Sequence, residues 1–351
     1  MPEPLLAAVL NERFVPDGKV LRLRGTEQES FHEAAASAAI SRFGREVFVR
    51  GVVEISNHCR ENCAYCGMRR SNRGLERYRA TVEELAELLV HRRPRSVTDV
   101  SLQAGEDPQA VRQVALPLIR ILKRETSLGI IVCLGTLEPG LYRELREAGA
   151  EVYILKFELA NRRDYERHDA PGTLEERVEH IRLLAEEGWF VSSGFIVGLP
   201  GQSEAKLLEN FRLAAELPLS GCSVSPFVPG ADTPLARGRM GDLEVTLNCM
   251  AALRLMQQSW VIPAVSALNL AGPGEGYGRG LRAGANLVTM NLTPERMRDA
   301  YILYRRDRFI MTEERILAAI AAEDLVPSGQ SVGEYLRQSS GQPAAPIPVG
   351  G

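Results

Sequence analysis

Three cysteines stand close together near the start of the chain, in the stretch SNHCRENCAYCGMRRSN at residues 56–72. They are Cys59, Cys63 and Cys66, which follow a Cx3CxxC pattern. In one tight loop this spacing aims three thiolates at a common centre, and Gly67 lets the backbone approach closely. The triplet therefore predicts a metal site with three protein ligands.

Two kinds of metal group compete for this triplet. A structural zinc site takes four ligands, usually as two separated pairs, and His58 adjoins Cys59 too closely to serve as the fourth without strain. A [4Fe–4S] cluster on three cysteines leaves one iron without a protein ligand and open to a small molecule. The missing fourth cysteine favours the cluster, with zinc as the alternative.

Composition limits the classes of partner and the compartment. The 351 residues carry a net charge of −3, which disfavours nucleic acid or an anionic membrane surface as a general partner. The N-terminal stretch MPEPLLAAVLNERF has no basic region, and its apolar run is too short for a signal segment or a membrane span. We therefore expect a cytoplasmic protein.

Six cysteines are too few for a disulfide scaffold. The three outside the triplet, Cys133, Cys222 and Cys249, are predicted to be buried apolar side chains.

The elements that must position these residues alternate in type along the chain. Amphipathic helical stretches at 81–93, 144–150, 174–188 and 204–217 lie between β-rich runs. The β-rich runs are 46–56, 96–103, 129–135, 151–158, 190–198, 221–227, 261–267 and 285–291. This rhythm predicts an α/β fold, a (βα)8 TIM-type barrel with its active site at the C-terminal strand ends, and an open doubly wound sheet is the alternative.

The chain divides into three predicted parts. Residues 1–45 form an N-terminal helical extension, whose clearest helix is ESFHEAAASAAISRFG. The barrel spans 46–327. The C-terminal segment, 328–351, becomes rich in Pro, Gly and Ala and is predicted to be disordered from about 339.

Charged residues close several of the predicted strands. Glu106 follows the turn at Gly105, although acidic residues there would also suit a helix N-terminus. Glu158 closes an apolar strand, where a lone acid is unlike a core residue, and Lys156 shares its face and is suited to an anionic substrate group. Arg177 opens the next helix, where the dipole disfavours a cation, so it is either a site residue or a surface arginine.

The cysteine motif, with the aromatic Tyr65 before its last cysteine, resembles the signature of the radical S-adenosylmethionine (SAM) superfamily. The resemblance implies a radical SAM barrel with a [4Fe–4S] cluster on Cys59, Cys63 and Cys66. It also implies that the open iron binds the amino and carboxylate groups of SAM. One-electron reduction would then cleave SAM to methionine and a 5′-deoxyadenosyl radical.

Further cofactor contacts follow from the same resemblance. The AGE stretch is similar to a GGE motif that holds the SAM amino group, Glu158 and Arg177 would bracket the methionine part, and GFIVG resembles a GxIxG adenine-binding stretch. Glycines near a strand end also serve packing or a turn, which is the alternative for that last stretch. The contacts implied are Tyr65, Ala104, Gly105, Glu106, Glu158, Arg177, Gly194, Ile196 and Gly198.

Within the superfamily the chain resembles the branch of biotin synthase, methylornithine synthase and the HydE-type maturase of [FeFe]-hydrogenase, and it is most similar to the HydE type. The resemblance rests on CAYCGMRRSNRGLERYR, AGEDP, KFELAN, IVGLPGQ, PFVPGADTPLA and RAGANLVTMNLTP. Biotin synthase holds a second cluster on cysteines of inner strands, but Cys133 is not at an equivalent position, and Ser192 stands where another such cysteine is expected. Some HydE-type proteins carry an accessory cysteine trio near the C-terminus, and residues 302–320 contain no cysteine. One cluster is therefore expected.

The expected activity is metallocofactor maturation of the HydE type on a small anionic or sulfur-containing molecule. Sulfur insertion and a methylornithine synthase-like carbon-skeleton rearrangement are the alternatives, and a non-catalytic, metal-stabilised binding module is the alternative class. The resemblance implies a reducing partner such as flavodoxin or ferredoxin. Candidate substrate contacts, each of which could instead satisfy a local backbone group, are Lys156, Ser266, Asn291, Thr293 and Tyr301.

Overall fold

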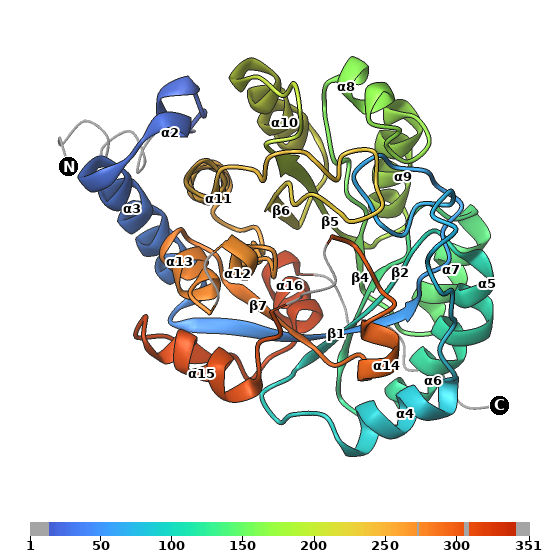
Figure 1. The fold of residues 1–351 in the computed structure, drawn as a ribbon. Helices are drawn as coiled ribbons and strands as arrows, with labels where there is room; N and C mark the ends of the chain where they lie inside the picture. Colours follow the sequence, from blue (N-terminus) through green and yellow to red (C-terminus); the bar gives the residue numbers. More distant parts are fainter. Residues whose placement is uncertain (1–13, 272–273, 305–308, 342–351) are drawn as a thin grey trace.

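The computed structural model describes residues 14–271, 274–304 and 309–341, and a curved parallel sheet forms its centre (Figure 1). The ladder runs in the order β6-β5-β4-β3-β2-β1-β7, and β8 pairs with the start of β1. The strands are β1 Glu46–Ser56, β2 Asp99–Ala104, β3 Gly129–Cys133, β4 Val152–Ile154, β5 Phe190–Val197, β6 Gly221–Pro226, β7 Leu287–Asn291 and β8 Val326–Pro327.

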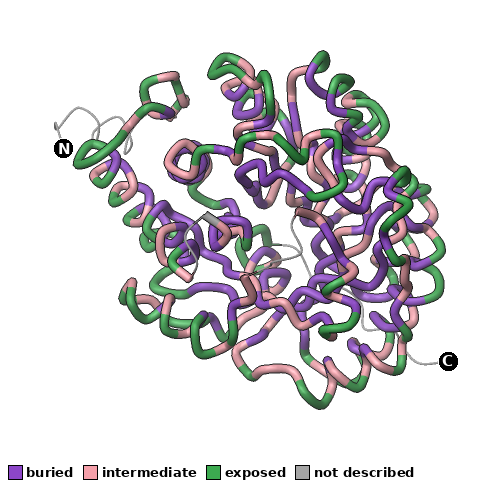
Figure 2. The backbone as a smooth tube through the Cα atoms, viewed as in Figure 1, coloured by how far each residue is buried: buried purple, intermediate pink, exposed green. Residues whose placement is uncertain are grey.

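Helices follow the strands and surround the sheet, with their apolar sides turned towards it (Figures 1 and 2). The first half of the chain contributes α2 Gly18–Arg22, α3 Gly25–Phe43, α4 Val82–His91, α5 Pro108–Ala110, the π-helical turn η1 Val111–Ala115, α6 Leu116–Glu125, α7 Pro139–Glu147, α8 Arg162–Arg167 and α9 Leu174–Glu186. The second half contributes α10 Glu204–Glu216, α11 Leu243–Met256, α12 Leu268–Ala271, α13 Gly276–Arg282, α14 Glu295–Arg298, α15 Glu313–Ala321 and α16 Val332–Ser340.

The sheet is closed into a ring by a segment that is barely a strand. The predicted strand at 261–267 is reduced to two single bridges, in which Val261 pairs with Gly221 of β6 and Pro263 pairs with Leu287 of β7. Main-chain hydrogen bonds flank both bridges. With this segment as the seventh position, the parallel order is that of a (βα)8-type barrel. The predicted α/β barrel fold is confirmed. The prediction of a regular seventh strand at 261–267 was wrong, because Pro263 has no N–H to donate to a strand ladder.

Arg254 of α11 anchors this closing segment from behind. Its side chain is fully buried and donates to the carbonyls of Gly284, Gln258 and Trp260 at 2.8, 2.6 and 2.8 Å, and to Oδ1 of Asn286 at 2.9 Å. Burial lowers the pKa of Arg254 to about 9. One guanidinium therefore satisfies four acceptors around the weakest part of the ring.

The two ends of the chain pack against the barrel from different sides. In the predicted N-terminal extension, 1–45, helix α3 lies along α11, and Gln28 and His32 both bond Asn248 there, at 2.8 and 3.0 Å. Residues 1–13 lie outside the described residues. At the other end, α16 continues through Ser340, and its residues Val332 and Leu336 are buried. Most of the tail for which disorder is predicted falls beyond this helix. The remaining tail, 342–351, lies outside the described residues.

None of the helices in the described ranges combines the length and the apolar character needed to cross a bilayer.

Replacing Arg254 by Met should destabilise the protein strongly. The substitution removes the Arg254 donors from three main-chain carbonyls and one of the two donors to Oδ1 of Asn286, and we expect it to cost about 3 kcal/mol of the free energy of unfolding. Urea denaturation of the purified protein measures this loss. Arg212→Met on the exposed face of α10 is the matched control and should stay within about 0.5 kcal/mol of wild type. Equal stability of the two variants would contradict the anchoring role of Arg254.

Candidate active site

The cysteine loop lies at the C-terminal end of β1 and is held mainly by backbone contacts. The guanidinium of Arg77 donates to the carbonyls of Met68 and Arg69 at 2.9 and 2.8 Å, and also to that of Asn57. The amide of Ala64 donates to the carbonyl of His168 at 2.8 Å. The loop is therefore fixed to its own far end and to the segment after α8.

The three cysteine side chains meet at one cavity. Cys59, Cys63 and Cys66 all line a space of about 190 Å³, which we call the upper cavity. Burial raises the pKa of all three thiols, that of Cys66 to about 12, and Cys63 also lies within electrostatic range of the other two. In the described ranges, no three Cys, His, Asp or Glu side chains surround one point closely enough for a single metal ion. Three thiols spread around an open space suit a cluster better than the zinc ion that the sequence left as the alternative.

The turn after β2 packs directly against this loop. A Cβ built on Gly105 would lie 2.7 Å from Cβ of Cys59 and would also collide with the carbonyl of His58, so only glycine fits. The amide of Glu106 donates to Sγ of Cys59 at 3.4 Å. The GED turn thus sets the position of the first cysteine as well as that of the Glu106 carboxylate.

A buried ion pair joins Glu106 to Arg177. Nη2 of Arg177 lies 2.9 Å from Oε1 of Glu106, and the two side chains are 4% and 7% exposed. A capping box at Thr173 fixes the start of α9, and this start directs Arg177 inward. Burial alone would lower the pKa of Arg177, but Glu106 and Tyr165 raise it. Nε of Arg177 has no hydrogen-bond partner in the described part of the chain, so one buried donor is available to a ligand.

Glu158 also lines the upper cavity, in a strained backbone conformation. Its φ is 61°, which is unusual for a residue with a side chain. Its amide donates to the carbonyl of Gly194, and its carbonyl accepts from the amide of Ile196, both at 3.0 Å. Burial raises the pKa of Glu158, while Lys156 and Arg177 act in the opposite direction. The strand pairing therefore holds this carboxylate at the cavity in spite of the local strain.

Of the GFIVG stretch, only the isoleucine faces the upper cavity. A Cβ on Gly194 would lie 2.5 Å from the carbonyl oxygen of Ser223 on β6. Gly198 has a φ of +88° and packs against Gly241. Packing and a turn account for both glycines without any ligand.

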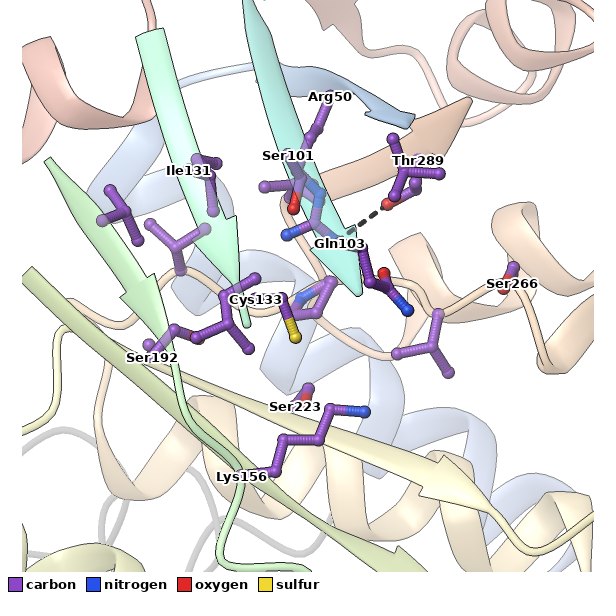
Figure 3. A pocket seen from close by; sticks show the side chains of 18 of the residues that line it. Arg50, Ser101, Gln103, Ile131, Cys133, Lys156, Ser192, Ser223, Ser266 and Thr289 are labelled. Atoms are coloured by element: carbon purple, nitrogen blue, oxygen red, sulfur yellow. Dashed lines mark hydrogen bonds between the residues drawn. The ribbon is translucent and has the colours of Figure 1, made fainter. Parts of the chain in front are cut away.

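Below the upper cavity lies a second one of about 140 Å³, which we call the deep chamber (Figure 3). Nη2 of Arg50 donates to Oγ1 of Thr289 at 3.0 Å, and Nε of Arg50 has no partner in the described ranges. The side chains of Lys156 and Cys133 enter the same space (Figure 3). The two cavities share the residues Gln103, Cys133, Ile154, Lys156, Ser225, Leu303 and Tyr304.

The five candidate substrate contacts separate into two groups. Lys156 and Tyr301 line the upper cavity, and Lys156 and Ser266 line the deep chamber. Asn291 and Thr293 line neither. Asn291 donates to the Glu54 carboxylate at 3.2 Å, and Thr293 accepts from the Glu54 amide at 2.9 Å. Their contacts therefore match the alternative of local bonding.

The three isolated cysteines also differ from one another. Cys222 and Cys249 are fully buried in the core, as the sequence predicted. Cys133 was wrongly assigned to the same class, because it stands at the end of β3 with its thiol open to both cavities. Burial raises its pKa, whereas Lys156 and Arg50 act to lower it.

Arg50, a buried cation of the deep chamber, was not predicted as a site residue from the sequence. The available signal was a lone cation in the middle of an apolar strand, at even spacing from Glu54 and therefore on the same face. Burial lowers the pKa of Arg50.

Comparison with known proteins gives a consistent result. The model of the Radical SAM superfamily matches residues 53–214. The chain is 35% identical over 261 residues to the [FeFe] hydrogenase maturase subunit HydE of Thermotoga maritima, covering 74% of each protein. It is 28% identical over 281 residues to 3-methylornithine synthase of Methanosarcina barkeri, covering 80% of this chain and 79% of that one. The crystal structure of methylornithine synthase PylB superposes with a TM-score of 0.82 at 24% identity, over 95% of this chain and 99% of that chain.

Gly105→Ala should displace the cysteine loop without unfolding the barrel. Because the new methyl group would collide with Cys59 and the His58 carbonyl, we expect the iron bound per chain after anaerobic reconstitution to fall at least several-fold. Gly140→Ala in α7 is the control, since nothing lies within 4 Å of a Cβ there. Full iron content in Gly105→Ala would show that this close approach does not position Cys59.

Proposed function

The chain belongs to the radical SAM superfamily, and from this premise we propose that Cys59, Cys63 and Cys66 hold its [4Fe–4S] cluster while the upper cavity binds SAM. The observation that carries the proposal is the convergence of the three motif thiols, three carboxylates and one guanidinium on a single cavity that continues into the deep chamber. The carboxylates are those of Glu61, Glu106 and Glu158, and the guanidinium is that of Arg177. When bound, the cluster and SAM supply a 5′-deoxyadenosyl radical that attacks a small-molecule substrate.

The charged groups of the upper cavity suit the charges of SAM. The methionine part of SAM carries an ammonium and a carboxylate, and its sulfonium is positive. Glu158 offers a carboxylate that no described residue holds in an ion pair, and Arg177 offers its free Nε–H. We propose that Glu158 and Glu106 meet the positive groups and that Arg177 meets the carboxylate. Tyr65, Ala104, Gly105 and Ile196 form the walls around them.

The protein's own task is to hold the reacting partners in contact and to exclude water. Substrate in the deep chamber would lie directly below SAM, because the two cavities share a wall at Cys133, Lys156 and Gln103. Proximity of this kind replaces a bimolecular encounter by an oriented one. Lys156 is suited to fix an anionic substrate group at that boundary. Burial lowers the pKa of Lys156 less than Glu158, Tyr304 and Cys133 raise it, so the ammonium stays charged.

Among the reactions of the branch, we favour metallocofactor maturation of the HydE type. Support comes from the 35% identity to a HydE maturase over three-quarters of both chains. Carbon-skeleton rearrangement, as in methylornithine synthase, is the second candidate. Sulfur insertion from a second cluster is disfavoured, because Cys133 is the only cysteine of the described ranges that lines the deep chamber.

Two further proposals follow from radical SAM chemistry. The cluster needs a one-electron donor, for which a flavodoxin or a ferredoxin is suited, and it needs a compartment that keeps thiols reduced, which favours the cytoplasm. We also propose 46–327 as the catalytic barrel, with the N-terminal helices and the C-terminal segment as its extensions.

Cys63→Ala should abolish SAM cleavage. The remaining two thiols cannot hold the cluster, so we expect 5′-deoxyadenosine and methionine to fall to background when reconstituted protein is given dithionite and SAM. Mass spectrometry measures both products. Cys249→Ala, at a buried residue that lines neither cavity, is the control and should keep the wild-type rate. Wild-type product formation by Cys63→Ala would overturn the proposal.

Glu106→Gln should weaken SAM binding with less effect on the cluster. The change leaves the buried Arg177 without its counter-charge and removes one anion from the cavity, so we expect SAM affinity to fall about tenfold or more. Titration of the reduced cluster with SAM by EPR measures the affinity. Glu144→Gln, in a surface ion pair with Arg112, is the matched control. Unchanged affinity in Glu106→Gln would exclude this residue from the SAM site.

A further inference from the structure

Helix α16 closes the end of the barrel opposite the upper cavity. It lies within the outline of the strand ring in Figure 1, and its residues Val332 and Leu336 line the deep chamber. These two side chains complete an apolar cluster with residues from the bases of several strands. Those residues are Phe48, Ile131, Val152, Phe190, Val261 and Leu287. The deep chamber therefore has an apolar floor, part of which comes from the C-terminal segment.

Specific contacts dock α16 in this position. Both carboxylate oxygens of Asp99 lie 3.0 Å from the amide of Val332, at the start of the helix. Arg337 forms an ion pair with Glu151, and the Tyr335 ring lies 5.0 Å from that of Phe43.

Two glycines make this close approach possible. A Cβ on Gly333 would lie 2.6 Å from Oε2 of Glu151, and a Cβ on Gly129 would lie 2.7 Å from Cβ of Ser331. The hydrogen bonds to Asp99, the ion pair with Glu151 and the two close glycine contacts therefore hold α16 in one position.

The wall above the floor is polar and carries two cations, Arg50 and Lys156, together with one carboxylate, Glu54, which accepts a hydrogen bond from Asn291 at 3.2 Å. Arg50 and Lys156 both line the chamber, and Cys133 lies between them in the view of Figure 3. Ser101, Ser192 and Ser223 add hydroxyl groups to this wall (Figure 3). Because Nε of Arg50 is a buried donor without a partner in the described ranges, this level is suited to an oxyanion.

We propose that the deep chamber takes a small organic acid whose carboxylate lies between Arg50 and Lys156, and that Val332 and Leu336 of α16 form the floor that limits the length of its non-polar end. This inference rests on the proposed function, since it names the substrate class of the same barrel. The bottom face of such a barrel usually serves stability alone. Here it also sets substrate length.

The dimensions of the chamber agree with a short molecule. An apolar cavity of about 150 Å³ accommodates a benzene-sized ligand. The deep chamber, at about 140 Å³, therefore has room for a carboxylate with a short aliphatic chain. Each buried methylene should strengthen binding about fourfold until the chain meets the floor.

Protection of Cys133 from alkylation tests the proposal without knowledge of the natural substrate. Cluster-loaded protein without SAM is treated with iodoacetamide in the presence of straight-chain carboxylates from acetate to octanoate, and peptide mass spectrometry quantifies labelling at Cys133. Cys222 and Cys249 are fully buried and report any opening of the core. In the wild type we expect protection to increase with chain length to an optimum and then to decrease. An absence of protection by every carboxylate would overturn the proposed substrate class.

Two substitutions at one position should move the optimum in opposite directions. Leu336→Ala deepens the chamber, so longer carboxylates should protect best, and Leu336→Phe raises the floor, so shorter ones should. Val332→Ala gives a milder deepening and serves if either variant fails to fold. Leu89→Ala, an equal truncation in α4 outside the chamber, is the control and should keep the wild-type optimum while losing stability.

The outcomes separate this inference from the proposed function. An unchanged optimum in folded Leu336 and Val332 variants would overturn the assignment of α16 as the floor, even if wild-type protein cleaves SAM. Failure of the wild type to form 5′-deoxyadenosine would instead count against the proposed function.

Discussion

The contact between the cysteine loop and the turn after β2 is the constraint on which the candidate site depends. Gly105 allows the turn to touch Cys59 and the His58 carbonyl, and the next residue, Glu106, continues to Arg177. Through this path the ends of β1 and β2 and the start of α9 are fixed relative to one another. A parallel barrel brings these ends to one rim, but only the glycine brings them within van der Waals distance.

The apolar runs of the sequence predicted most of the barrel because β1, β2, β3, β5 and β6 are largely buried on both faces. Strand β1 matches its predicted range, and β2, β3, β5 and β6 differ from theirs mainly at their ends. The segment at 261–263 could not be predicted in the same way. Its apolar composition is that of a strand, but Pro263 removes a ladder donor. Arg254 holds the segment through the Trp260 carbonyl, and Oδ1 of Asn286 accepts from the Ile262 amide. A local sequence window does not reveal the contact with Asn286.

The candidate site was predictable where residues act in sequence clusters. The cysteine triplet and Glu158 were evident from spacing and from a lone charge at a strand end. Arg50 and α16 were not, for different reasons. Arg50 lies inside a strand whose neighbours are apolar, so its side chain was assigned no partner. Helix α16 follows β8 in a segment whose end is rich in Pro and Gly. Its role depends on Asp99 and Glu151, which lie far away in the chain.

The interior of this barrel carries more charge than stability alone would favour. Arg50, Lys156, Glu158 and the Glu106–Arg177 pair are removed from bulk water, and desolvation of such groups costs more than one ion pair returns. Charges of both signs line each level: Arg177 lies among the carboxylates of the upper cavity, Glu54 and Arg50 line the deep chamber, and Lys156 lines both. A charged ligand in either cavity would supply partners for groups of this kind. Ligand binding therefore explains the buried charges better than stability does.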